Sequence, residues 1–124
     1  MPIARGWAIL GATAAFLGVG LGAFGAHALS ALPPDRLANW ETGARYQMYH
    51  AFGLFAVSVA AGRWPTSFVR HAGTAFIAGI VLFSGSLYAI ALTGIRTFGA
   101  VAPIGGGAFL TGWALLGWTA WRDG

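Results

Sequence analysis

The sequence predicts an all-α integral membrane protein with four transmembrane helices in an up-down-up-down bundle. Hydrophobic residues make up 57% of the 124 residues and charged residues only 8%, whereas a soluble domain carries about a quarter charged residues. Four uncharged runs are long enough for a bilayer core of about 30 Å, which takes about 20 apolar residues to cross. The last two links between these runs are short, and short links make neighbouring helices antiparallel.

The first helix is expected over residues 6–29, where the chain carries no Asp, Glu, Lys or Arg. An N-terminal positive charge, an apolar stretch and small residues at 26 and 28 are also features of a secretory signal peptide. The apolar stretch from Trp7 to Phe24 is longer than the core of a signal peptide, which has about 7–15 residues. We therefore interpret this segment as a transmembrane helix.

The second helix is expected over residues 36–62. Pro33 and Pro34 end the preceding helix, and Asp35 is a signal for the start of the next one. The uncharged part begins only at Tyr46, so the first turns of this helix are expected in the headgroup layer. It is the shortest of the four uncharged runs.

The third and fourth helices are expected over residues 71–93 and 98–121, with a tight link at residues 94–97. Four crossings place both termini on one side of the membrane. The basic residues near the helix ends then divide four against three, and the positive-inside rule places both termini inside the cell. The larger group is Arg5, Arg63, Arg70 and Arg122, and the smaller is Arg36, Arg45 and Arg96.

Small residues in these helices are expected to form packing faces, because helices in lipid associate by close van der Waals contact. In the first helix, small residues recur at four-residue spacing. The positions assigned to helix packing are Gly18, Gly22, Ala26, Gly79, Gly85, Gly105, Gly106 and Gly112. The alternative for the glycines at 105–107 is a groove for a ligand or lipid. Most of the six tryptophans are expected to be anchors at the membrane interface.

Polar residues within the crossings are the candidates for function, because they are costly in a bilayer. The expected topology brings eight of them toward one side of the membrane: His27, Arg45, Tyr46, Gln47, His50, Ser84, Ser86 and Tyr88. Three interpretations remain open. They are a structural network in which each imidazole finds a hydrogen-bond partner, a metal or haem site using His27 and His50, and a proton or substrate site, since histidine titrates near neutral pH.

Several classes of chemistry are disfavoured. The chain has no Cys, which excludes disulfides, thiolate metal sites and cysteine nucleophiles. Two imidazoles without a carboxylate or thiolate are an incomplete zinc site, so we expect no metal ion. We likewise expect no cofactor and assign no catalytic residue. The arginines are scattered, unlike a nucleic-acid-binding patch, so we expect no nucleic-acid partner. The crossings contain no Asp or Glu to carry a proton for a cation exporter.

Six short runs are familiar as a set: GAFGAHAL at 22–29, WETG at 40–43, YQMYHA at 46–51, LFSGSLY at 82–88, APIGG at 102–106 and GW at 112–113. Together they resemble the family called domain of unknown function 423, small integral membrane proteins of bacteria with relatives in eukaryotes. The resemblance implies a multi-pass protein of the bacterial inner membrane with four helices. It also implies recurring polar positions at His27, Gln47, His50, Ser84, Ser86 and Tyr88, and it supplies no reaction.

The sequence favours a structural or accessory membrane protein. Such a protein would contact membrane lipid, and it would bind a protein partner or a second copy through the glycine faces of the first, third and fourth helices. The alternative is a minimal oligomeric transporter or channel, with a pore lined by His50, Gln47, Ser84 and Tyr88. An enzyme ranks third, because no pair of nucleophile and base stands out.

Overall fold

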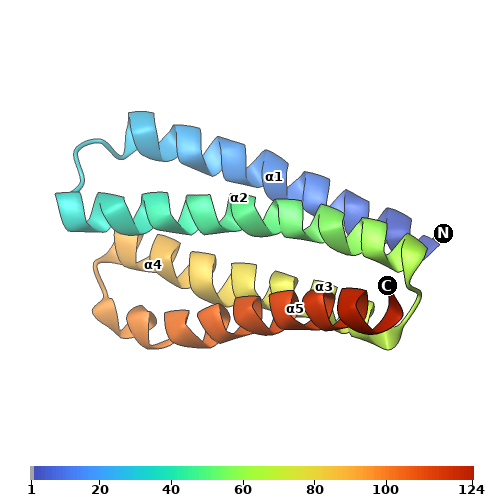
Figure 1. Cartoon of the computed structure of the whole chain (residues 1–124). Coiled ribbons are helices and arrows are strands. Elements are labelled where there is room, and N and C mark those ends of the chain that lie inside the picture. Colours follow the sequence, from blue (N-terminus) through green and yellow to red (C-terminus); the bar gives the residue numbers. More distant parts are fainter. Residues whose placement is uncertain (1) are drawn as a thin grey trace.

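The computed structural model describes residues 2–124, with side chains from Ala4 onward, and it is all-helical over that range. Four helical rods lie side by side (Figure 1). The first is α1 (Pro2–Ala28) and the second is α2 (Pro34–Arg63). The third joins α3 (Ser67–Gly79), the π-helical turn η1 (Ile80–Ser84) and α4 (Gly85–Thr93) without a break. The fourth is α5 (Ala102–Asp123), preceded by the short 3-10 helix η2 (Arg96–Ala100). The all-α prediction is confirmed.

Proline and glycine set the ends of the rods. Pro34 is the first residue of α2, where a missing N–H costs nothing because the first turn has no carbonyl to bond it. Gly94 ends the third rod in the left-handed region with φ of +72°, and its N–H donates to the carbonyl of Ile90 at 2.7 Å. A residue without Cβ is favoured there.

Three helical segments are long and apolar enough to cross a membrane: Ala4–Ala28, Ser67–Thr93 and Arg96–Asp123. The 30 residues of α2 would extend about 45 Å, so its length also suffices, but its composition is more polar. Part of that polarity comes from Gln47 and His50, which are both buried inside the protein. Three of the four predicted crossings therefore have the composition of a membrane span.

The rods form an open array rather than a closed ring. α2 and the third rod lie at the centre, α1 packs chiefly against α2, and α5 packs chiefly against α3 and η1. Figure 1 shows α1 and α5 at opposite edges of the array, with the links between successive rods at alternate ends and both termini at the same end. The core between α2, α3 and α5 contains the fully buried Leu54, Val57 and Phe76.

α1 meets α2 through glycines that are seven residues apart. Gly11, Gly18 and Gly25 are all buried. A Cβ atom on Gly18 would lie 2.6 Å from the Met48 sulfur, and one on Gly25 would overlap the Trp40 ring. Seven residues are close to two helical turns, so these positions stay on one face of α1. The close approach of the two helices requires glycine at these positions.

α5 meets the third rod in the same way. A Cβ on Gly105 would overlap the main chain of Phe83, and one on Gly112 would lie 2.5 Å from the Phe76 ring. Gly79, on the opposing rod, is covered by the ring of Phe109. The predicted packing positions Gly18, Gly79, Gly105 and Gly112 thus lie between helices of this chain.

Four other positions assigned to helix packing are not packed inside this chain. Gly22 and Ala26 are exposed, and a Cβ on Gly22 or Gly85 would meet nothing within 4 Å. The nearest atom to a Cβ on Gly106 is 4.0 Å away. The prediction of one continuous stripe was wrong for α1 because each four-residue step rotates the position by about 40° around the helix. Gly22 and Ala26 have therefore turned away from α2.

Candidate functional site

The predicted polar cluster divides into two groups. The first group is centred on Gln47 of α2, which is 4% exposed. Its Nε2 donates to the carbonyl of Ala14 on α1 at 2.9 Å, and its Oε1 accepts a hydrogen bond from the Tyr88 hydroxyl of α4 at 2.7 Å. One amide side chain thus joins three rods, and both ends of the amide are hydrogen-bonded.

Two serines near this group donate to main-chain carbonyls. Ser84 is fully buried, and its hydroxyl donates to the carbonyl of Gly43 on α2 at 2.7 Å. Ser86 donates to the carbonyl of Phe83 in its own turn at 2.8 Å. The Tyr88 ring lies so close to Gly43 that a Cβ there would be 2.9 Å from it. These contacts bring α2 and the third rod close together.

The second group surrounds His50 between α2 and α5. Its Nδ1 donates to the carbonyl of Tyr46 at 2.8 Å, and the indole N–H of Trp113 donates to its Nε2 at 3.0 Å. A donor at Nδ1 and an acceptor at Nε2 define a neutral imidazole with its proton on Nδ1. The ring also stacks on Phe109, with centroids 3.5 Å apart and planes 8° from parallel. Both ring nitrogens are thus used within the protein.

His27 does not join either group. It is exposed at the end of α1. Gly25, two residues before His27, lies against Trp40 of α2. His50 is ten residues after Trp40, so it lies about 15 Å further along α2. The two imidazoles therefore do not converge, and the metal or haem site that used both is wrong. Residues 2–124 contain no group of three or more His, Cys, Asp or Glu side chains placed to hold a metal ion.

Arg45 also lies outside the two groups, exposed on α2. Glu41 is four residues earlier, at a spacing that favours an ion pair in a helix. No carboxylate oxygen lies within 4.0 Å of Arg45, since the single ion pair among the described residues joins Arg122 and Asp123. The guanidinium of Arg45 is therefore available to another anion.

The tryptophans contribute more to the interior than the sequence suggested. Trp40 is 3% exposed, and its indole N–H donates to the carbonyl of Leu21 at 2.7 Å. Trp113 is 45% exposed, and its indole N–H donates to Nε2 of His50. Trp40, Ala44 and Gln47 are buried at helical spacing. This spacing was the available signal that Trp40 faces inward.

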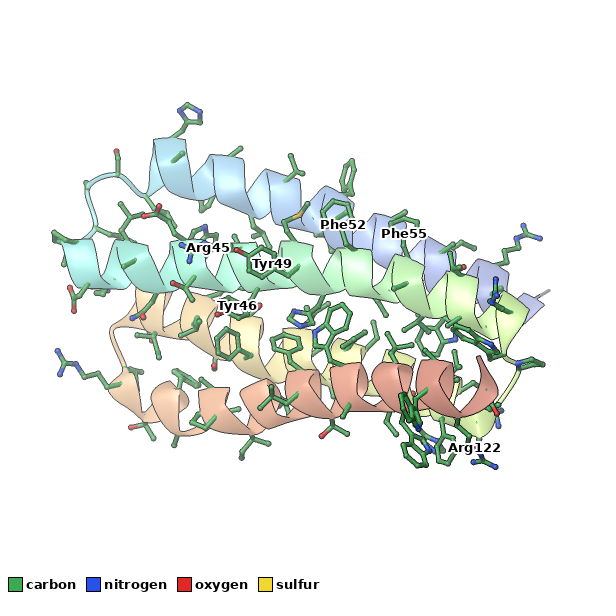
Figure 2. The ribbon with its side chains drawn as sticks, in the orientation of Figure 1. Arg45, Tyr46, Tyr49, Phe52, Phe55 and Arg122 are labelled. Carbon is green, nitrogen blue, oxygen red and sulfur yellow. The ribbon has the colours of Figure 1, made fainter. Side chains whose placement is uncertain are left out.

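A groove of about 760 Å³ lies beside the second group, between α2 and α5. Figure 2 shows Tyr46 directed from α2 toward α5. Gly106 and Gly107 form part of the wall of the groove, and their lack of side chains keeps the groove open. The residues that line it are Tyr46, Tyr49, His50, Phe83, Pro103, Gly106, Gly107, Phe109, Leu110 and Trp113. Ligand pockets have volumes of about 300–1,000 Å³, so the groove has room for a small molecule or a lipid chain.

The buried polar side chains of the two groups are hydrogen-bonded within the protein. Among residues 2–124, the one buried side-chain polar atom without a hydrogen-bond partner is Oγ1 of Thr66, at the start of α3 and outside both groups. Buried polar atoms are stable in a low-dielectric interior when they are paired in this way. The hydrogen bonds of the two groups therefore join helices of this chain, and the groove is the feature open to a ligand.

Comparison with known proteins places this chain among membrane proteins. The sequence profile of the family described as "Protein of unknown function (DUF423)" matches residues 21–106, which confirms the resemblance seen in the sequence. UPF0382 membrane protein YwdK of Bacillus subtilis is 51% identical over 110 residues, which are 87% of this chain and 89% of the relative. UPF0382 inner membrane protein YgdD of Escherichia coli is 40% identical over 109 residues, covering 87% and 83%. No solved structure matches this sequence.

Proposed function

We propose, from the premise that this chain belongs to the DUF423 family of membrane proteins, that it is an accessory protein of the bacterial inner membrane. Its role would be to bind a partner helix within the bilayer, either of another protein or of a second copy. The observation that carries this proposal is a second face of small residues on α1, which the other rods of this chain leave uncovered.

The proposal treats residues 1–124 as a single integral membrane domain whose four rods all cross the bilayer, up-down-up-down, with both termini inside the cell. The polar side chains of α2 do not oppose this arrangement. Gln47 and His50 are buried and hydrogen-bonded, so lipid would meet mainly the apolar outer residues of α2, such as Phe52 and Val59. Buried polar groups that are paired by protein are tolerated in a bilayer.

The second small face of α1 lies beside the one that packs on α2. Its positions alternate in steps of three and four residues, as in a helix packed against a neighbour, and all are fully or partly exposed. A shallow groove of about 520 Å³ lies along its first half, lined in part by Gly20. The face consists of the small residues Ala12, Ala15, Gly22 and Ala26, with the larger Val19 between them. Small residues on a lipid-facing helix allow another helix to approach closely.

Several of the glycines first expected to bind a partner are used within the chain. Gly18 packs on α2, and Gly105 and Gly112 pack on the third rod. A partner would therefore meet the outer face of α1 and not these glycines. The alternative function, a transporter or channel lined by His50, Gln47, Ser84 and Tyr88, has less support because these side chains are hydrogen-bonded inside the protein.

The absence of native Cys permits a direct test. Val19→Cys lies on the small face of α1, and Val59→Cys is a matched control on α2, since both valines are exposed, at 63% and 73%. With a thiol-to-amine or thiol-to-thiol cross-linker in native membranes, Val19→Cys should give one defined adduct, identified by mass spectrometry. Val59→Cys should give none. Equal cross-linking at both positions, or none at either, would contradict a partner on this face.

A further inference from the structure

We propose that the groove between α2 and α5 binds one phospholipid, with an acyl chain along the groove and the phosphate at Arg45. This proposal is independent of a partner on α1, because the groove and the small face of α1 lie on different helices. Four features of the groove favour this occupant: its length, its width, its lining and the charge beside it.

The length of the groove matches one leaflet. Its wall on α5 extends from Pro103 to Trp113, and ten residues of helix correspond to about 15 Å. That is half of the hydrocarbon core of about 30 Å. Pro103 is at the end of α5 where this helix begins, so the groove leads from one membrane surface toward the middle of the bilayer.

The width of the groove fits a chain better than a helix. A volume of about 760 Å³ over about 15 Å gives a mean cross-section of about 50 Å². A helix with side chains is about 10–12 Å in diameter, a cross-section of about 80 Å² or more. A helix is therefore too wide to lie wholly inside the groove, whereas a hydrocarbon chain fits within it.

The lining is apolar where a chain would lie. Phe83, Leu110 and the glycines offer only carbon and main-chain atoms. His50 has both ring nitrogens bonded to Tyr46 and Trp113. The hydroxyls of Tyr46 and Tyr49 are the other polar side-chain atoms of the lining. An unsatisfied polar wall would favour a polar ligand or water. This wall favours hydrocarbon.

The charge beside the groove complements a phosphate. Arg45 directly precedes Tyr46 and is one turn before Tyr49, and both tyrosines line the groove. These three residues follow one another along the same stretch of α2 (Figure 2). Side chains on a helix lean toward its N-terminus, so the exposed Arg45 leans toward the membrane surface at which α2 begins. It has no carboxylate partner among residues 2–124, and a guanidinium bonds phosphate oxygens strongly.

The test is a lipid titration of the purified full chain by native mass spectrometry, using phosphatidylglycerol and diacylglycerol with the same chains. Gly107→Leu places a side chain in the groove at a position where a Cβ meets nothing within 4 Å. Gly117→Leu is the matched control, since it is equally open on the same helix and does not line the groove. Arg45→Gln removes the charge alone.

We expect wild type and Gly117→Leu to retain one phosphatidylglycerol, and Gly107→Leu to bind it at least about tenfold more weakly, a change of about 1.4 kcal/mol. Arg45→Gln should lower the affinity for phosphatidylglycerol to that for diacylglycerol. Equal binding by Gly107→Leu and Gly117→Leu would overturn the proposal. So would a dimer in place of the lipid adduct, lost in Gly107→Leu, because it would make a second copy the occupant.

A second measurement remains decisive if Gly107→Leu fails to fold. Phosphatidylglycerol with brominated acyl chains should quench the fluorescence of Trp113, which lines the groove. The quenched fraction should fall in Trp113→Phe and saturate at one lipid per chain. Quenching that is unchanged in Trp113→Phe, or that rises without saturation, would show only the general lipid around the protein and would overturn the site.

Discussion

Replacing Gly105 by Ala should destabilise the protein, whereas replacing Gly107 by Ala should stabilise it. A Cβ at Gly105 would overlap the main chain of Phe83, lying 2.8 Å from its Cα, whereas one at Gly107 meets nothing within 4 Å. Alanine stabilises a helix by about 1 kcal/mol relative to glycine. Overpacking costs about 1–3 kcal/mol, and the upper end applies because main-chain atoms of a helix cannot rotate away. The net change is a loss of about 2 kcal/mol for Gly105→Ala and a gain of about 1 kcal/mol for Gly107→Ala.

The free energy of unfolding of both variants can be measured in mixed micelles, by titrating a denaturing detergent and following helical circular dichroism. Each variant is compared with wild type in the same micelle. The expected separation is about 3 kcal/mol, or more than about a hundredfold in the unfolding equilibrium. If the two variants differed by less than about 0.5 kcal/mol, the close packing of α5 against η1 would be refuted.

Three further predictions can use the same unfolding measurement. Gln47→Leu and Tyr88→Phe should each destabilise. The double variant should lose less than their sum by about 0.6 kcal/mol, the mean for one hydrogen bond in a membrane protein, and by at most about 1.7 kcal/mol. Strictly additive losses would count against the 2.7 Å bond. Gly18→Leu should lower the free energy of unfolding while Gly22→Leu leaves it unchanged, because of these two only Gly18 is closed in by α2. Equal effects would disprove the seven-residue face. Trp40→Phe should lose about 1 kcal/mol with its hydrogen bond to the carbonyl of Leu21, and an unchanged stability would contradict that bond.

The positions of the helices could be predicted because a segment that crosses a bilayer carries few charged side chains. A long uncharged run therefore marks such a segment. The proline pair at 33 and 34 marked the start of α2, and Gly94 ends the third rod at the expected tight link. The continuous passage through η1 was not predictable from composition, because the same apolar run is compatible with α-helical or π-helical bonding.

The packing faces were only partly predictable. Composition showed that the helices are rich in glycine, but the face that a glycine occupies depends on the crossing of two particular helices. Gly11 and Gly25 pack on α2 while Gly22 does not, and the sequence of α1 alone does not distinguish them. The contact is fixed jointly by α1 and by Met48 and Trp40 of α2.

For the candidate site, the residues that come together were easier to predict than the way in which they are arranged. Gln47, Ser84 and Tyr88 lie close together as expected, because the depth of a residue follows from its place in a helix. His27 lies apart because the exposed end of α1 does not reach the level of His50. The contact of Trp113 with His50 depends on how α5 is placed beside α2, and no local pattern encodes that placement.

The sidedness of the two termini tests the central claim most directly, because α2 is the one rod whose crossing depends on burial of its polar side chains. Reporter fusions at the N-terminus and after Gly124 can be compared in cells, using a reporter pair active on opposite sides of the inner membrane. Four crossings predict that both fusions report the same side, and the basic residues near the helix ends predict that it is the cytoplasmic side. Termini on opposite sides would mean three crossings, and α2 would then lie outside the bilayer.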